Sequence, residues 1–327
     1  MAESINEIKI AESARIIGEV ELGEASYLAQ GAIIRSHQGV RLGNNTWVLE
    51  NSTVIGTKKQ PTLIGSKTVF GHKCVVLGAT IGNLCEIGNG SIFMPGSKIG
   101  DRCIFGESTI VPELMEIPSD SVVVGRPARI IRKLSKEDFE RIKQMRNDDV
   151  ELSEHNGIRV VRPIKEVEEM GKLHPYKNHY PKVADSAVIL DSAEINGDVE
   201  IGDNSVISHG VKIIGNSHGP VKIGKNVQIL ENCVLHLLPD NQLIIEDDVI
   251  IGPGSIIHGT MIGKGSIIES GSNVCDYSSI GENCIVKAGS LVKQRSVFQE
   301  NTVIEGFPGK AVGTLIKLLT RPPWAYK

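Results

Sequence analysis

A repeat of six residues constrains this chain more than any other feature of its sequence. Isoleucine–glycine pairs recur at that interval and its multiples, for example Ile81-Gly82, Ile87-Gly88 and Ile99-Gly100, and again Ile262-Gly263 and Ile280-Gly281. An aliphatic residue at every sixth position, followed by Gly, Asp or Asn, is typical of a short strand ending in a tight corner. Three such units would close one triangular coil, and stacked coils would pair about 4.8 Å apart.

A second, longer repeat duplicates this pattern at a constant offset, by which position 49 corresponds to position 230. Leu49-Glu50-Asn51 matches Leu230-Glu231-Asn232, and Gly125-Arg126-Pro127 matches Gly306-Phe307-Pro308. From about residue 42 onward the register holds without a gap. The chain is therefore predicted to be an all-β protein made of two tandem parallel β-helices, each with its own stack of aliphatic side chains.

The predicted boundaries are 1–134 for the first β-helix and 180–327 for the second, which ends in a tail. Residues 135–179 would join them as a helix and a polar linker. Ser135 is the expected N-cap of that helix. Its apolar stripe, formed by Phe139, Ile142 and Met145, is expected to pack along the side of the first prism. Trp324 and Tyr326, in the tail, either dock on a neighbouring surface or are loosely held.

The composition excludes several classes of function. Net charge is -4, so no basic field for nucleic acid is present. No run of 18 apolar residues is found, which argues against a membrane span, and the first residues do not resemble a secretory signal. The 6 cysteines form no Cys-x-x-Cys pair. They are expected to be buried, reduced thiols, which is typical of a cytoplasmic protein. Since nucleic acid and membrane are not indicated, the expected partner is a small-molecule substrate.

Two short segments carry a family resemblance. The second repeat contains Val234-Leu235-His236 and His258-Gly259, the first contains Gly71-His72, and both close on a Gly-x-Pro turn. This order of motifs resembles the γ-class carbonic anhydrases, within the wider hexapeptide-repeat transferase superfamily. The resemblance implies left-handed β-helices, although parallel crossovers are usually right-handed. It also implies a homo-oligomer formed through the prism faces, and a zinc ion held by three histidines between two subunits.

The three zinc positions of that family are only partly filled here. In the second repeat they hold His236, Pro253 and His258, and in the first repeat they hold Ile55, His72 and Leu77. Each repeat therefore keeps what the other has lost. Neither repeat alone has the complete ligand set.

The geometry of a triangular coil suggests how the set could be completed. Side chains five residues apart leave from different faces, so His258 and the residue at position 253 could not bind one metal ion from one prism. If a first-repeat prism packed against a second-repeat prism, His72 would join His236 and His258. Three imidazoles with an open fourth position suit catalytic zinc. The alternative is a vestigial site, because like repeats meet like around a threefold axis.

The resemblance also bears on the remaining active-site positions. The family's arginine corresponds to Arg35, which would orient a carbonyl-bearing or anionic substrate, and Glu50 or Glu231 could replace the missing acid. The family's glutamine corresponds to Leu49 and Leu230. Its loss, together with a shortened loop after His236, argues against carbon dioxide hydration and leaves metal-assisted hydrolysis or acyl transfer on a small carbonyl or acyl substrate.

Two further functions fit the same fold. Hexapeptide β-helices also serve as CoA-dependent acyl- and acetyltransferases, with a single histidine as general base. His37 and His218 are the candidates for that role, since each follows a small polar loop. His37 also falls where the family has an aspartate, as Asn216 does in the second repeat. The third interpretation is a β-helical scaffold without chemistry. A zinc-dependent lyase, an acyltransferase and a scaffold thus remain open.

Overall fold

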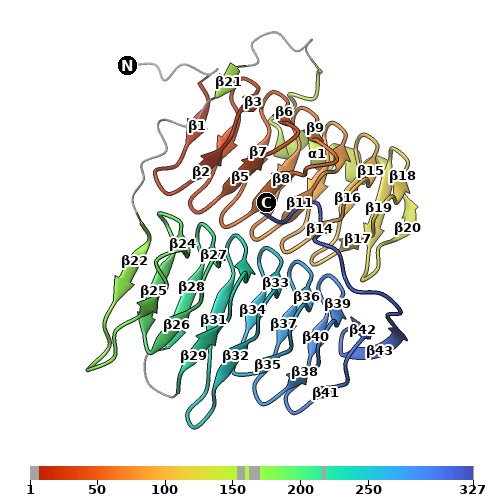
Figure 1. Cartoon of the computed structure of the whole chain (residues 1–327). Coiled ribbons are helices and arrows are strands. Elements are labelled where there is room, and N and C mark those ends of the chain that lie inside the picture. Colours follow the sequence, from red (N-terminus) through yellow and green to blue (C-terminus); the bar gives the residue numbers. More distant parts are fainter. Residues whose placement is uncertain (1–6, 153–158, 162–169, 216–218, 327) are drawn as a thin grey trace. The chain divides into compact units, whose positions relative to one another are not determined.

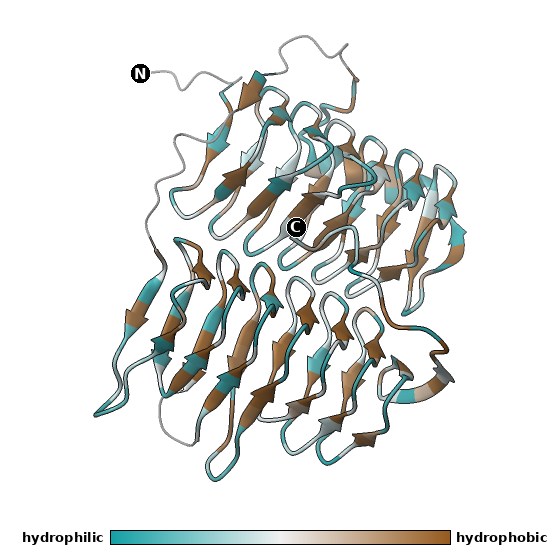
Figure 2. Cartoon of the chain, in the orientation of Figure 1, coloured by the Kyte–Doolittle hydropathy of each residue, from teal (hydrophilic) through white to brown (hydrophobic). Residues whose placement is uncertain are grey.

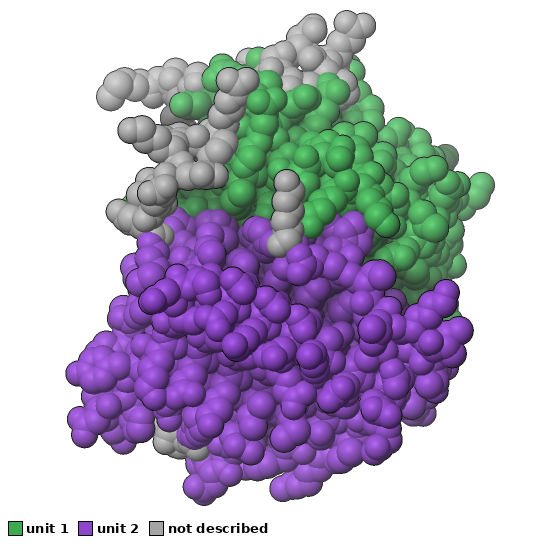
Figure 3. Space-filling view, viewed as in Figure 1, with its two compact units in different colours: residues 1–165 green, residues 166–327 purple. Residues whose placement is uncertain are grey.

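The computed structural model describes residues 7–152, 159–161, 170–215 and 219–326. They divide into two compact units, residues 1–165 and 166–327 (Figure 3). Each unit is a parallel β-helix whose strands are stacked coil upon coil (Figure 1). The predicted fold class is confirmed, and the stacking is consistent with the left-handed winding of hexapeptide repeats. His155, Asn216 and His218 lie outside the described residues.

Three sheets form the walls of the first unit, and each is named here by its first strand. The β1 sheet contains β1 (Lys9–Ile10), β4 (Tyr27–Leu28), β7 (Trp47–Val48), β10 (Val69–Phe70), β13 (Glu86–Ile87), β16 (Ile104–Phe105), β19 (Ser121–Val124) and β20 (Arg129–Lys133). The β2 sheet contains β2 (Arg15–Ile17), β5 (Ile33–Ser36), β8 (Thr53–Gly56), β11 (Val75–Leu77), β14 (Ile92–Phe93) and β17 (Ile110–Val111). The β3 sheet contains β3 (Val20–Leu22), β6 (Val40–Leu42), β9 (Thr62–Ile64), β12 (Thr80–Ile81), β15 (Lys98–Ile99), β18 (Glu116–Ile117) and β21 (Arg159–Val161).

Three equivalent sheets form the second unit. The β22 sheet contains β22 (Lys172–His174), β25 (Glu194–Gly197), β28 (Lys212–Gly215), β31 (Val234–His236), β34 (Ile256–Ile257), β37 (Asn273–Val274) and β40 (Leu291–Val292). The β23 sheet contains β23 (Lys182–Val183), β26 (Val199–Ile201), β29 (Val221–Ile223), β32 (Leu243–Ile245), β35 (Met261–Ile262), β38 (Ser279–Ile280) and β41 (Val297–Phe298). The β24 sheet contains β24 (Val188–Ile189), β27 (Val206–Ile207), β30 (Gln228–Ile229), β33 (Ile250–Ile251), β36 (Ile267–Ile268), β39 (Ile285–Val286), β42 (Thr302–Gly306) and β43 (Gly309–Thr314).

The aliphatic residues of the six-residue repeat fill the interior of each prism. Ile81 pairs in register with Ile99 on the next coil, and Ile99 pairs with Ile117 on the coil after that. All three are buried, and burying one such side chain stabilises a fold by roughly 1.5–3 kcal/mol. Figure 2 shows that the strands carry hydrophobic residues interspersed with hydrophilic ones, and that the corners between them are mostly hydrophilic. The corner residues Asn51 and Asn232 adopt positive φ values of 55° and 57°, a conformation that asparagine tolerates.

Both units end in the same way. An antiparallel hairpin closes each prism, β19 with β20 in the first unit and β42 with β43 in the second. These hairpins carry the two Gly-x-Pro turns that correspond to each other across the long repeat. Each unit is then followed by a segment that folds back on the β1 sheet or on its equivalent, the β24 sheet.

In the first unit that segment contains helix α1 (Lys136–Met145). Ser135 caps it as predicted, and Ser135 and Asp138 form a reciprocal capping box. Ile142 is buried, but Met145 is exposed, contrary to the predicted apolar stripe. The next residue, Arg146, is buried instead because its guanidinium contacts the carboxylate of Glu86 and donates to the carbonyl of Lys67. The helix is therefore fixed on the first prism largely by a charged side chain.

The predicted linker contains more regular structure than expected. Strand β21 pairs antiparallel with β3, and β22 pairs with β25 and begins the second β-helix. Leu173, in β22, packs against the core of the second unit, which explains why this strand forms before residue 180. Among the described residues, no helix has the length and apolar character needed to cross a membrane.

Candidate functional site

The structure brings His236 and His258 together on one face of the second unit. His236 ends β31, and His258 directly follows β34, the next strand of the β22 sheet. The register of the two strands places the two residues one above the other. Their ring centroids are 6.1 Å apart and the ring planes are inclined at 85°. Two imidazoles that bind one zinc ion tetrahedrally have centroids about 5 Å apart, which is about 1 Å less than the separation of these rings.

A buried carboxylate lies behind this pair. Oδ2 of Asp276 is 3.3 Å from Nδ1 of His258, and the Asp276 side chain is 5% exposed. The other oxygen, Oδ1, accepts hydrogen bonds from the backbone N–H of Leu238 and of Gly259 and from the side chain of Asn241. The loop after His236 is thereby held against the next two coils.

Gly259 is required for this arrangement. A Cβ atom at Gly259 would lie 2.2 Å from Nδ2 of Asn241, so no larger residue fits beneath the loop. The glycine after His258 therefore belongs to the local architecture of the site. It lets the loop approach closely enough for Asn241 and Leu238 to reach Asp276.

His72 lies at a corner of the first unit, between β10 and β11. Its Nδ1 is 2.7 Å from Oε2 of Glu50, which occupies the same corner on the preceding coil. His72 and Glu50 are 54% and 40% exposed, so this is a surface pair. Leu77, five residues on, ends β11 in the β2 sheet, whereas His72 lies at the corner before that strand. The predicted separation of these two positions is thus observed.

The other metal positions of the first unit are apolar and closed. Ile55 and Leu77, the counterparts of His236 and His258, are both completely buried. Pro95 is the counterpart of Asp276 in the long repeat. The first unit therefore has neither the histidine pair nor the carboxylate behind it.

Arg35 is also buried, with only 1% of its surface exposed. It lies in β5, where it pairs in register with Ile55, and its Nη1 is 2.5 Å from Nε2 of His37. The structure thus brings together two of the predicted site residues, Arg35 and His37, in the first unit. Their roles toward a substrate stay a prediction.

Glu231, the counterpart of Glu50, has a different partner. Its Oε1 accepts a hydrogen bond of 3.0 Å from the hydroxyl of Tyr326, and that hydroxyl is 2.8 Å from Oγ of Ser208. Gln228 bonds to the backbone of Tyr326 through both its amide oxygen and its amide nitrogen. Trp324 is 2% exposed. The tail therefore docks on the second unit, one of the two alternatives that the sequence left open.

One histidine acquires a partner that sequence reasoning missed. Nδ1 of His209 is 2.7 Å from Oδ1 of Asp191, and its side chain is 12% exposed. The spacing between Asp191 and His209 in the sequence equals that between His258 and Asp276. Because that spacing is three six-residue units, or one coil, it places two residues at the same corner of adjacent coils. It was the signal available in the sequence.

Two of the cysteines are poorly suited to bind a metal ion. Burial raises the pKa of Cys74 to about 12, and burial also raises the pKa of Cys233 to about 12. A metal-binding cysteine must be a thiolate, which such an environment disfavours. In the described ranges no three His, Cys, Asp or Glu side chains form a group that could hold a metal ion. The second unit supplies two neighbouring histidines, so a site with three ligands would need a third one from elsewhere.

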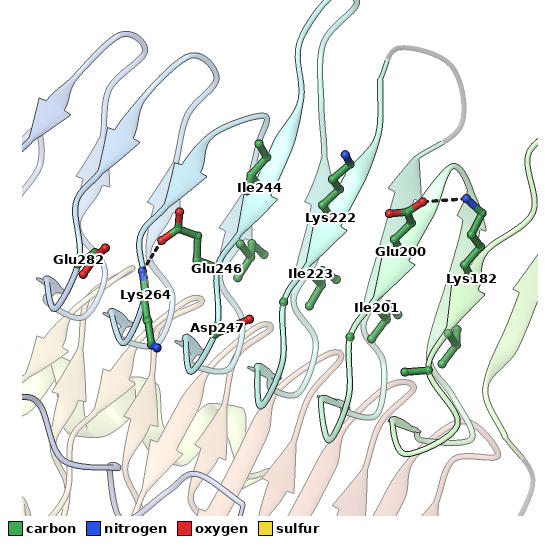
Figure 4. A pocket seen from close by; sticks show the side chains of 15 residues that line it. Lys182, Glu200, Ile201, Lys222, Ile223, Ile244, Glu246, Asp247, Lys264 and Glu282 are labelled. Atoms are coloured by element: carbon green, nitrogen blue, oxygen red, sulfur yellow. Dashed lines mark hydrogen bonds and ion pairs between the residues drawn. The ribbon is translucent and has the colours of Figure 1, made fainter.

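A cleft of about 840 Å³ runs along the β23 sheet of the second unit. Figure 4 shows that charged side chains of successive strands line it. Nζ of Lys182 is 2.8 Å from Oε1 of Glu200, and the backbone N–H of Lys264 donates to Glu246 at 2.9 Å. None of the predicted site residues that the structure describes lies in this cleft. Its charges largely neutralise one another, as expected of a solvated sheet face.

Comparisons with known proteins agree with the repeat fold. Residues 78–112 match the family described as bacterial transferase hexapeptide (six repeats), and residues 61–92 and 242–274 match the hexapeptide repeat of succinyl-transferase. A probable carbonic anhydrase of Methanocaldococcus jannaschii is 34% identical over 148 residues, which are 45% of this chain and 93% of that protein. The chain belongs to the γ-carbonic-anhydrase-like hexapeptide-repeat proteins.

Other relatives of this γ-carbonic-anhydrase-like protein include a carbonic anhydrase of Geobacillus kaustophilus. It is 40% identical over 104 residues, which are 32% of this chain and 57% of that protein. The chain thus spans little more than half the length of that relative. A solved structure of a putative acetyltransferase from Bacillus cereus is 40% identical, with a TM-score of 0.43, over 44% of this chain and 83% of that one.

Proposed function

We propose that this γ-carbonic-anhydrase-like protein is a zinc enzyme whose metal site is divided between its two repeats. His236 and His258 of a second unit and His72 of a first unit would hold the ion. The substrate would be a small carbonyl or acyl compound. Because each unit has an incomplete ligand set, the site forms only where a first unit meets a second unit.

The observation that carries this proposal is the way in which the ligand set is divided. The second unit has two stacked histidines with a buried carboxylate behind one of them. The first unit has the remaining histidine with a carboxylate 2.7 Å from its Nδ1. Metal-binding histidines usually direct their second ring nitrogen to such a partner. Chance survival of isolated histidines after a duplication would not be expected to keep a carboxylate beside two of the three.

The chain's own residues would orient the ligands and the substrate. Bound zinc would supply an ionisable water at neutral pH. Glu50 would hold the proton on Nδ1 of His72 and leave Nε2 for the metal. Arg35, fixed beside His37, would orient a carbonyl or anionic group. Glu231 is completely buried and binds the hydroxyl of Tyr326, whereas the side chain of Glu50 is 40% exposed, so Glu50 is the better candidate for the missing acid.

Metal analysis of the purified protein tests the proposal. We expect about one zinc ion per chain in the natural protein and a fall to background in His72→Ala, His236→Ala or His258→Ala. His179→Ala is a matched control, since His179 is 58% exposed and lies apart from the candidate positions. Full zinc content in His72→Ala would show that the first unit contributes no ligand. Absence of zinc from the natural protein would exclude the proposed enzyme.

The same measurement addresses the oligomer. We infer that the protein is a homo-oligomer that associates through its prism faces. Mixing the two variants that are expected to lack zinc, His72→Ala and His236→Ala, tests whether the three ligands of one site come from one chain or from two. Recovery of up to half a zinc ion per chain would place the ligands on different chains, and no recovery would place them on one.

The pair formed by His209 and Asp191 favours a second candidate function, acyl transfer. His209 is a largely buried histidine whose carboxylate partner is 2.7 Å away, the arrangement of a general base. It would take the proton from the hydroxyl or amine that accepts an acyl group from CoA. Calorimetric titration with acetyl-CoA tests this candidate. Binding of acetyl-CoA by a protein that contains no zinc would favour acyl transfer. If the protein bound neither acetyl-CoA nor zinc, the non-catalytic scaffold would be the remaining interpretation.

A further inference from the structure

Asp276 has one carboxylate oxygen that the architecture of the loop uses and one that it does not. Oδ1 accepts the three hydrogen bonds that hold the loop after His236. Oδ2 faces Nδ1 of His258 at 3.3 Å. A buried carboxylate is costly unless its charge has partners. The loop alone would be served equally well by an amide, so the negative charge points to a further role.

His258 is placed so that its two ring nitrogens have different surroundings. Nδ1 is buried and neither accepts nor donates a hydrogen bond among the described residues, and Oδ2 of Asp276 lies 3.3 Å from it. The side chain as a whole is 32% exposed. The exposed part of the ring is therefore the part away from Nδ1. A group that approaches the ring from outside meets that edge.

The two repeats provide an internal comparison. In the first unit Leu77 stands in place of His258, and Pro95 stands in place of Asp276. Gln60 replaces Asn241 in the corresponding loop. Where the histidine is lost, the carboxylate is lost as well, although the prism and its loop remain. The coil itself therefore does not need an acid at this position.

We propose that Asp276 is a positioning residue, which holds the proton of His258 on Nδ1 and so presents an unprotonated Nε2 at the exposed edge. This inference rests on the proposed function, in which Nε2 binds the metal ion. A neutral imidazole carries one proton, and a carboxylate beside one nitrogen favours the tautomer with the proton there. The 3.3 Å contact does not form a hydrogen bond in the structure, so the carboxylate would act on the tautomer through its charge.

Asp276→Asn separates the two roles of this side chain. The amide oxygen would still accept the three hydrogen bonds that Oδ1 accepts, so the loop is retained. The amide N–H₂ would face Nδ1 of His258 and would favour Nδ1 as an acceptor. The proton would then move to Nε2, and the metal-binding nitrogen would be blocked. Asn241→Ala does the opposite, since it weakens the loop and leaves Oδ2 unchanged.

The experiment is ¹⁵N NMR of metal-free protein labelled at histidine, with the His258 signals assigned from His258→Gln. The natural protein and Asn241→Ala should show protonated Nδ1 and unprotonated Nε2. Asp276→Asn should show the reverse, and its zinc affinity should fall about 10–100-fold. Asp191→Asn is the control, because it changes a comparable histidine–carboxylate pair and should leave His258 unaffected.

The outcomes separate this inference from the proposed function. If His258 carries its proton on Nε2 in the natural protein, or if Asp276→Asn leaves the tautomer unchanged, the inference is overturned. If the tautomers follow the expectation and no zinc binds, the positioning role stands and the proposed zinc enzyme does not. A circular-dichroism melt of each variant shows whether the second unit is folded during these measurements.

Discussion

The two units are built on the same coils but treat the same positions in opposite ways. On one face, the second unit has His236, His258 and Asp276, whereas the first unit has two buried aliphatic residues and a proline there. At the neighbouring corner the first unit keeps an exposed histidine–glutamate pair. The second unit has a proline in the place of that histidine. The two repeats thus share a scaffold but differ in their candidate site residues.

The segments that follow the two prisms differ in the same way. Helix α1 is anchored on the first unit through the buried Arg146 and its contact with Glu86. The tail of the second unit is anchored through Tyr326, a neutral side chain that donates to Glu231. A prism wall of this kind presents the same surface on every coil, so individual polar contacts fix the position of a segment that covers it. The comparison can be tested through those anchors and through the site positions.

Each unit contains one tryptophan, which allows the two to be followed separately. Trp47 belongs to the first unit and Trp324 to the second, and the sequence has no other. Fluorescence of a Trp324→Phe background reports the first unit, and that of Trp47→Phe reports the second. Separate reporters are needed because a chain with two units is not expected to unfold in one step.

The largest effect is expected for Arg146→Ala. The change leaves the carboxylate of Glu86, which is 15% exposed, without its charged partner. Removing one member of a buried pair costs about 3–5 kcal/mol, measured as urea unfolding of the first unit. Lys287→Ala in the second unit is the comparison. Lys287 is 37% exposed and Glu269 keeps the N–H of Ala288, so about 1 kcal/mol is expected.

The loss in Arg146→Ala should also depend on pH. Burial raises the pKa of Glu86, and Arg146 opposes that shift. Without the arginine the pKa should rise further. A carboxyl group whose pKa is higher in the folded state takes up a proton on folding, so stability increases as pH falls through that range. The deficit should therefore shrink between pH 7 and pH 5. A deficit that grows on acidification would contradict this account.

An intermediate effect is expected for an exchange of site residues between the units. Leu77→His places an imidazole at a completely buried position that has Pro95 in place of an acid. The lost apolar contact and the buried polar atoms together should cost about 2–5 kcal/mol. His258→Leu in the second unit removes a side chain that is 32% exposed and should cost about 1 kcal/mol. Equal losses of unfolding free energy in the two variants would show that the position of Leu77 tolerates a histidine as readily as its counterpart in the second unit tolerates a leucine.

Most of the fold could be predicted from the sequence because the six-residue pattern recurs in many successive coils. A single Ile-Gly pair is weak evidence for a β-helix. The same register holds through most of the long repeat, however, and this predicts both prisms. His236 and His258 lie more than three six-residue units apart, so their pairing was predicted from the family resemblance and not from the period. Glu50 and His72 are separated by more than three six-residue units, because the coil between them includes the loop from Thr57 to Pro61. A strict coil period would have missed that pair.

The parts that the sequence could not supply are those without a period. Met145 completes a helical stripe on paper, yet it is exposed because Arg146 finds a carboxylate on the prism. The contact of Tyr326 with Glu231 joins residues 95 positions apart through a tail that follows no repeat. Such contacts depend on the path that a segment takes after the last coil. The local periodicity of the sequence does not determine that path.

The smallest difference is expected between two variants at the same corner of the two units. Tyr326→Phe removes a hydrogen bond from Glu231, which is completely buried. Hydrogen bonds to charged groups contribute about 1.5–3 kcal/mol, so Trp324 fluorescence should report a loss of that size and earlier release of the tail. His72→Ala removes the partner of Glu50, but both side chains are well exposed. Its cost should be about 0–1 kcal/mol, seen through Trp47. If His72→Ala were the more destabilising variant, the corner of the first unit would serve stability, and the case for His72 as a metal ligand would be weakened.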